Sequence, residues 1–130
     1  MSDRGAVSII VVTGALALCV MALGAADLGS MLVARSRAQT AADGAALAAA
    51  VVQVAILGQQ GTPEEEARAF AERNSAELAR CSCEQGDAVA EVEVHVRPRL
   101  VFLRPWFGRI VRAVARAEVD RDVLSYREPG

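Results

Sequence analysis

The first part of the chain is dominated by apolar residues. The stretch from Ala6 to Ala26 contains no charged side chain. A helix rises about 1.5 Å per residue, so about 20 residues cross the roughly 30 Å hydrocarbon layer of a bilayer. The stretch is therefore long enough to cross a membrane once, and we expect a transmembrane helix over residues 6–34.

A single acidic residue, Asp27, interrupts the apolar sequence, which then resumes and ends at Arg35. If residues 6–26 fill the bilayer, the Asp27 carboxylate lies at one interface, where it reaches water or headgroups. If the helix sits deeper, the carboxylate needs a partner and becomes a contact to a helix of another protein. The sequence leaves both alternatives open. Gly29 and neighbouring small residues would allow a second helix to approach closely.

Helix-forming residues continue without a proline as far as Leu57. Arg35, Gln39 and Asp43 recur every four residues and therefore share one face of a helix. We interpret residues 35–60 as an extramembrane continuation of the same helix. Its polar face is either simply solvated or a contact surface for partner helices.

A second helix, of about 18 residues, is predicted to follow Thr62. Thr62 can cap its N-terminus, Pro63 suits the first helical position, and Glu65 completes a capping box. Its modest apolar face consists of Ala67, Phe70, Ala71 and Leu78.

Two later segments, "AVAEVEVHV" and "VRAVARAEVD", alternate between apolar and polar residues, as half-buried strands do. Paired antiparallel, they would set glutamates against arginines on the wet face and pack their Val/Ala faces on the second helix. Residues 61–130 are thus predicted to form a small α+β module, with a helix on an antiparallel β-hairpin. The whole chain is predicted to be a membrane-anchored α+β protein.

The segment between the two strands, "RPRLVFLRPWFGRI", is too long for a tight turn. It places Phe102, Trp106 and Phe107 beside arginines, and the prolines at 98 and 105 prevent one continuous helix. Such a segment either touches lipid headgroups or a partner protein, or folds its rings back to complete a thin core.

Composition narrows the classes of function. Hydrophobic residues make up 53% of the chain and aromatic residues 4%, which favours helix contacts over ligand pockets. The net charge of -2 argues against nucleic acid as a partner. No nucleotide-binding glycine pattern is present, and no metal or nucleophile motif includes the single histidine, His95. We therefore expect no enzyme activity, no metal and no cofactor.

The cysteines at 81 and 83 are separated by one residue, and a disulfide over that spacing is strained. We interpret the pair as an incidental feature of the end of the second helix. In an oxidising exterior the two thiols would either bridge subunits or stay reduced.

The N-terminal pattern has two other interpretations. Gly24-Ala25-Ala26 suits signal peptidase, and cleavage before Asp27 would release a small secreted binding module with the aromatic segment as its binding surface. We favour the uncut helix because helix-compatible sequence runs from Ala6 to Leu57. The other interpretation is a membrane-bound regulator whose C-terminal module lies in the cytoplasm.

The stretch "DLGSMLVARSRAQTAADGAALAAA", preceded by Arg4-Gly5, resembles the N-terminal region of TadE/TadG-like proteins of the Tad (Flp) pilus system. Those proteins are minor pilins, or pseudopilins. The resemblance covers roughly residues 4–57. All 14 basic residues other than the histidine are arginine, and this absence of lysine agrees with the actinobacterial TadE-like group. The more specific elements are Arg4-Gly5, Asp27-Leu28-Gly29, Arg35, Gln39 and Ala41-Ala42-Asp43.

The resemblance implies a single-pass subunit of the inner membrane, with residues 1–5 as a cytoplasmic leader and residues beyond about 35 outside the cytoplasm. It also implies membrane lipid, Tad-type pilin and assembly-platform proteins as partners, possible oligomers, and prepilin peptidase as a processing enzyme. That peptidase cuts after a glycine matching Gly5, which would leave Ala6 first. The glutamate of the family at the fifth mature position is replaced here by Ile10.

The charges flanking the span lean slightly toward the opposite orientation. Arg35 and Arg37 follow the span, against Arg4 before it, and basic residues favour the cytoplasmic side. Because this imbalance is small, we follow the resemblance and expect the C-terminal part outside the cytoplasm.

Overall fold

The computed structural model describes residues 3–54, 61–84 and 86–120 of the 130-residue chain. The three strands of this part form one antiparallel sheet in the order β1-β2-β3. The fold is α+β, as the sequence predicts. In chain order, the elements are α1 (Asp3–Val54), α2 (Pro63–Arg73), β1 (Glu77–Ser82), β2 (Val89–Val96), α3 (Arg104–Phe107) and β3 (Val111–Glu118).

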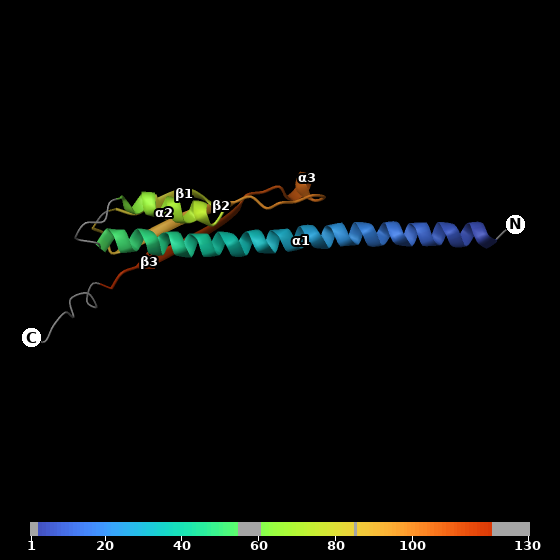
Figure 1. Ribbon diagram of the computed structural model, residues 1–130, viewed down its shortest axis with the longest axis horizontal. Coiled ribbons are helices and arrows are strands. Elements are labelled where there is room, and N and C mark those ends of the chain that lie inside the picture. The colour runs from blue at the N-terminus through green and yellow to red at the C-terminus, as the bar shows by residue number, and fades with distance from the viewer. Residues whose placement is uncertain (1–2, 55–60, 85, 121–130) are drawn as a thin grey trace, which may run out of the picture.

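Helix α1 is the axis of the molecule. Its N-terminal half projects alone, whereas its C-terminal half carries α2 and the sheet (Figure 1). Every side chain from residue 5 to residue 23 is exposed, and the helix is long and apolar enough to cross a membrane. The predicted long N-terminal helix is confirmed, and it continues into the folded module without a break.

The core lies between α1 and the inner face of the sheet. The side of α1 that faces the sheet is made almost entirely of alanine, while β2 contributes the fully buried Val92 and Val94. Because an alanine side chain is a single methyl group, the helix can lie close to the strands. The buried alanines of α1 are Ala34, Ala38, Ala41, Ala42, Ala45, Ala46, Ala49 and Ala50.

The two alternating segments form β2 and β3 and pair antiparallel, as predicted. Glu91 lies opposite Arg116 on the wet face, whereas Glu93 lies opposite Val114 and finds its arginine, Arg80, on β1. The prediction that α2 covers these strands is wrong. Helix α1 packs on β2 and β3, and α2 lies against α1 and the edge strand β1.

The predicted start of α2 is confirmed. The Thr62 hydroxyl accepts a hydrogen bond from the Glu65 N–H at 3.2 Å, and the Thr62 N–H donates to the Glu65 carboxylate at 2.8 Å. Pro63 occupies the first helical turn. This reciprocal capping box fixes where the helix begins.

The predicted length of α2 is wrong, because the helix ends at Arg73 after 11 residues. Asn74 follows as the C-cap and Ser75 adopts a left-handed backbone with φ 58°. Residues 77–82, which have a helix-forming composition, instead pair with β2 as strand β1. Tertiary pairing has overridden local propensity there, and the predicted hairpin becomes a three-stranded sheet.

Helices α1 and α2 meet at Gly44. A Cβ atom placed on this glycine would collide with the ring of Phe70, which packs partly buried against the core. The absence of a side chain at position 44 therefore lets α2 approach α1 closely enough to bury Ala67 and Ala71 completely.

Candidate functional site

The most unusual side chain of the structure is Asp27, which is 1% exposed although it lies on the largely bare part of α1. Its carboxylate accepts three hydrogen bonds from successive backbone N–H groups. Val101 donates to Oδ1 at 2.9 Å, and Phe102 and Leu103 donate to Oδ2 at 2.8 and 2.6 Å. We call this arrangement the Asp27 clamp and residues 97–110 the connector.

The local conformation of the connector explains why three N–H groups converge. Residues 101–103 form a bend that leads directly into the short helix α3, with Pro105 in its first turn. Successive N–H groups in such a bend point toward one side and make an anion-binding concavity. Here the anion is the protein's own carboxylate, and hydrogen bonds to an ionised group are stronger than neutral ones.

The clamp gives Asp27 a role that neither sequence alternative anticipated. Its carboxylate is not left to water or headgroups, and its two oxygens are occupied within the chain rather than free for another helix. Asp27 joins residues more than 70 positions apart in sequence. It therefore holds the connector against α1 at the position where the uncharged stretch ends.

The other predicted helix contacts lie on an open surface of α1. Gly29, Arg35, Gln39 and Asp43 are all exposed, and the Gln39 side chain donates to the Asp43 carboxylate at 2.9 Å. The exposed apolar residues Leu28, Leu32, Leu47 and Val51 extend the same ridge. We call Leu28, Leu32, Arg35, Gln39, Asp43, Leu47 and Val51 the lateral stripe.

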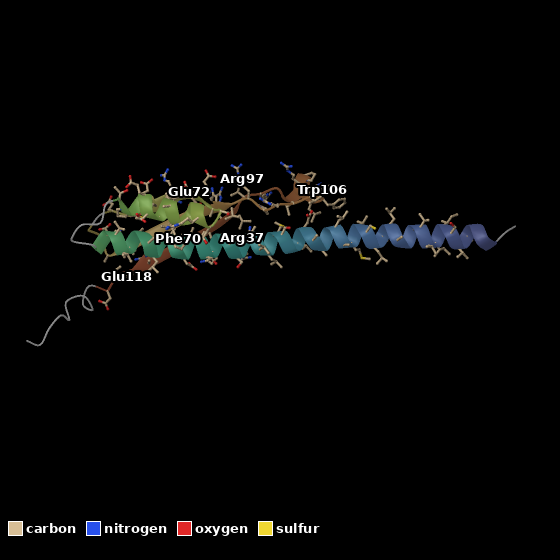
Figure 2. The ribbon with its side chains drawn as sticks, viewed as in Figure 1. Arg37, Phe70, Glu72, Arg97, Trp106 and Glu118 are labelled. Carbon is tan, nitrogen blue, oxygen red and sulfur yellow. A yellow bond between two sulfur atoms is a disulfide. The ribbon has the colours of Figure 1, made fainter. Side chains whose placement is uncertain are left out.

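The predicted aromatic surface lies at the end of the module beside the clamp. Trp106 is 68% exposed and Phe102 43% exposed, and Figure 2 shows Trp106 at the tip of the connector, away from the sheet. The rings of these two residues therefore do not complete the core. The Phe107 side chain lies outside the described part of the structure.

A cleft of about 1030 Å³ opens between α1 and the start of the connector. Gly29, Ser30 and Ala34 line it on the helix side, and the guanidinium-bearing residues Arg37, Arg97 and Arg99 line it as well. Arg37 and Arg97 lie in the same region of the molecule in Figure 2. Ser75, His95 and one acidic residue, Glu77, also line the cleft, which therefore carries an excess of positive charge.

Two further features, Gln53 and Gly44, were not predicted from the sequence. Gln53 is buried near the end of α1, and its side-chain amide donates to the carbonyl oxygens of Glu84 and Val89 at 2.9 and 3.3 Å. These bonds fix the helix to the β1–β2 loop. A polar residue within an alanine- and valine-rich run was the available signal for Gln53, whereas Gly44 had no local signal.

Cys81 and Cys83 form a disulfide at the end of β1, with their Cα atoms 5.3 Å apart. The interpretation as an incidental feature of a helix end is wrong, because the segment is a strand. Alternate residues of a strand point to the same side, which brings the two thiols together. The predicted alternatives of an intersubunit bridge or two free thiols are replaced by a bond within the chain.

A charged group lies on the outer face of the sheet. Arg80 donates to Glu93 at 2.8 Å, and His95 Nε2 lies 3.2 Å from the other Glu93 oxygen. The Arg80 guanidinium first, and His95 second, hold the pKa of Glu93 below its ordinary value of 4.5. His95 is thus a neighbour of an ion pair rather than an isolated surface residue.

This pKa shift predicts a pH dependence of stability. Because the pKa of Glu93 is lower in the folded chain, its contribution is present above pH 4.5 and is lost as the pH falls through the folded value. We expect the melting temperatures of the natural chain and Glu93→Gln to differ at pH 6 and to converge on acidification. A constant difference down to pH 3 would contradict the prediction.

No group of three or more potential metal ligands occurs among residues 3–54, 61–84 and 86–120. The predicted processing residues, Gly5 and Ala6, are exposed positions of α1. The described residues thus present exposed helix surfaces, the Asp27 clamp and a basic cleft.

Comparison with known proteins identifies the helix that carries the clamp and the lateral stripe. Residues 5–52 match the Tad family, whose members are described as Flp pilus-assembly TadE/G-like. Helix α1 is therefore similar to this family, over less than half of the 130-residue chain. No curated protein and no solved structure matches the chain.

The TadE/G-like match covers almost the whole of α1 and ends before α2. It includes Asp27, the lateral stripe and the buried alanines, so the matched helix supplies both the apolar N-terminal half and the alanines on which the sheet packs. The resemblance seen in the sequence is confirmed over this helix, and a role related to pilus assembly is supported.

Proposed function

We propose that this chain is a non-enzymatic, single-pass membrane subunit that assists assembly of a Tad/Flp-type pilus or a related secretion apparatus. It acts by packing its TadE/G-like helix against helices of pilin and assembly-platform proteins. The observation that carries the proposal is the bare surface of α1, which is apolar along its N-terminal half and continues as the lateral stripe beside the folded module.

The N-terminal half supports anchoring. Apolar side chains from Val7 to Leu23 are largely exposed, and no described segment of the chain covers them. A soluble protein rarely leaves so large an apolar surface open to water. A bilayer would accommodate this surface, because lipid tails would surround the apolar side chains and the helix already hydrogen-bonds its own backbone N–H and C=O groups.

The lateral stripe supports packing against partners outside the bilayer. Leu28, Leu32 and Leu47 are 59%, 70% and 60% exposed, and the polar residues between them offer charged and amide groups. Leu28 and Leu32 also line a groove with Val111 and Arg112 of β3. An apolar ridge interspersed with polar groups suits an amphipathic helix from another subunit.

The disulfide supports a location of the module outside the cytoplasm. A bond between Cys81 and Cys83 persists in oxidising compartments and is rare in the reducing cytoplasm. We therefore place the C-terminal module outside the inner membrane, with residues 1–5 inside. Processing by prepilin peptidase between Gly5 and Ala6 is part of the same proposal.

Site-specific photocrosslinking tests the packing proposal in cells. A photoreactive residue at Gln39 is expected to capture pilin-like or assembly-platform proteins, because this position lies in the middle of the lateral stripe. The matched control is Ala69, an exposed residue of α2 that lies off the stripe. Capture at Gln39 that does not exceed capture at Ala69 would argue against the proposal.

The intact mass of the mature chain tests the anchor itself. A start at Met1, Ser2 or Ala6 keeps the apolar half of α1 attached. A start at Asp27 would instead mean release by signal peptidase, although the structure shows an unbroken helix through residues 24–27. That result would favour a secreted binding module.

A further inference from the structure

The Asp27 clamp fixes the connector at one particular level along α1. Twenty-one uncharged residues precede Asp27, and a helix of about that length crosses the hydrocarbon layer. When residues 6–26 fill the bilayer, Asp27 lies at the boundary between hydrocarbon and headgroups. The three N–H groups that bind it place residues 101–103 at the same boundary.

The connector is also the part of the module that lies nearest to the N-terminal half of α1. Figure 1 shows the sheet beside the C-terminal half of the helix and α3 at the opposite end of the module, beside the middle of α1. The module therefore approaches a bilayer around the N-terminal half through the connector, whichever side of the membrane it occupies.

The side chains of the connector match such a boundary. Val101 is 81% exposed and Trp106 is 68% exposed, so apolar and aromatic groups point away from the core. Tryptophan is enriched at membrane interfaces because its ring is apolar and its N–H is polar. Residues 97–110 also include four arginines and no acidic residue, a charge pattern that complements anionic headgroups.

The basic cleft adds a place for a headgroup. It begins at Gly29 and Ser30, immediately beyond Asp27 on α1, and is lined by Arg37, Arg97 and Arg99. Guanidinium groups bind phosphate oxygens through paired hydrogen bonds, and the small residues on the helix side leave space for the phosphate. The cleft therefore lies just on the water side of the boundary, where phospholipid phosphates are found.

We propose that the connector is a membrane-surface element, which docks on anionic phospholipid headgroups of the bilayer that α1 spans. Val101, Phe102 and Trp106 enter the interface, and the arginines bind the phosphates. This inference rests on the anchoring of α1 in the proposed function. Docking would fix the orientation of the module relative to the membrane and leave the lateral stripe accessible to partner helices.

Trp106 is the single tryptophan of the chain and reports the position of the connector directly. The full-length protein is placed in nanodiscs of phosphatidylcholine alone or of phosphatidylcholine with phosphatidylglycerol. In the anionic discs we expect blue-shifted Trp106 emission, strong quenching by lipids brominated near the headgroup, and weak quenching by acrylamide in the water. In the zwitterionic discs we expect acrylamide quenching to rise by roughly twofold or more.

Variants separate docking from folding. Val101→Glu adds a carboxylate at an exposed position, so it should free the connector and raise acrylamide quenching in anionic discs without unfolding the module. Ala69→Glu, at an exposed position of α2 that lies off the lateral stripe, is the control and should leave Trp106 protected. A triple variant that neutralises three arginines of the connector, R99Q/R104Q/R109Q, should lose the preference for anionic discs. A control triple variant with the same change in charge outside the connector, R68Q/R73Q/R116Q, should keep this preference.

The outcomes distinguish this inference from the proposed function. One outcome overturns docking but is consistent with anchoring by α1. In it, the chain stays in the discs, acrylamide quenches Trp106 equally in anionic and zwitterionic lipid, and brominated lipid does not quench it. In that case the aromatic surface belongs to a protein partner. A chain that leaves the discs overturns the anchor and, with it, both proposals.

Discussion

Replacing Gly44 with leucine is expected to separate α2 from the rest of the module. Even the Cβ atom at this position would collide with the Phe70 ring, so a leucine must displace the ring and the helix that carries it. Overpacking and the lost burial of Phe70 together are expected to destabilise the module by about 2–4 kcal/mol. The measurement is hydrogen exchange of β2, which should become about 30- to 700-fold faster at the sheet centre.

Two controls attribute this effect to the contact between residues 44 and 70. Gly29→Leu makes the same change on the same helix, at a position where no atom lies within 4 Å of an added Cβ, and should leave exchange of β2 unchanged. In a Phe70→Ala background, Gly44→Leu should cost less than it does alone, because the colliding ring is gone. Equal costs in both backgrounds would show that the collision does not limit the approach of α2.

The second large effect is expected from Asp27→Asn. Asparagine keeps the shape of the side chain but has one acceptor oxygen, and its amide group would face the backbone N–H donors of residues 101–103. The connector should separate from α1. We expect amide exchange at residues 101–103 to rise by roughly tenfold or more, because these charge-assisted bonds are what protects them.

The matched control is Asp43→Asn, which neutralises an exposed carboxylate on the same helix whose side-chain partner is Gln39. It should leave exchange in the connector unchanged, and exchange in β2 should stay unchanged in both variants. Unaltered protection of residues 101–103 in Asp27→Asn would mean that the clamp does not hold the connector in solution.

The elements that the sequence predicts well are those with strong local signals. The uncharged stretch of residues 6–26 predicts the bare half of α1, the alternation around Val92 and Val94 predicts β2, and Thr62 with Glu65 predicts the start of α2. In each case a periodic pattern or a cap of a few residues is enough to specify the element.

Strand β1 was not predictable in the same way. Its residues, with Ala, Glu and Leu among them, favour a helix in isolation, and the left-handed Ser75 that ends α2 carries no strong sequence signal. The segment becomes a strand because β2 offers an edge to pair with. The prediction that α2 covers the sheet is wrong for a related reason: no local pattern shows that the alanines of α1 pack on β2 and β3.

The candidate site was predicted residue by residue but not as an arrangement. Asp27, Phe102 and Trp106 were each singled out, yet the contact between the helix and the connector spans more than 70 residues of chain, and no local pattern pairs them. The exposed lateral stripe followed from the spacing of Arg35, Gln39 and Asp43. Its role as a contact for partner helices remains a prediction.

The continuity of α1 has a mechanical consequence. Its 52 residues form one helix of about 78 Å without a proline, and the alanines at its far end are locked into the core. Any tilt or axial rotation imposed on its exposed N-terminal half is therefore transmitted to the strands as a rigid-body movement, because the described helix has no break that could act as a hinge. In the proposed membrane-anchored state, proteins that contact the N-terminal half of α1 would thereby set the direction that the outer face of the sheet points.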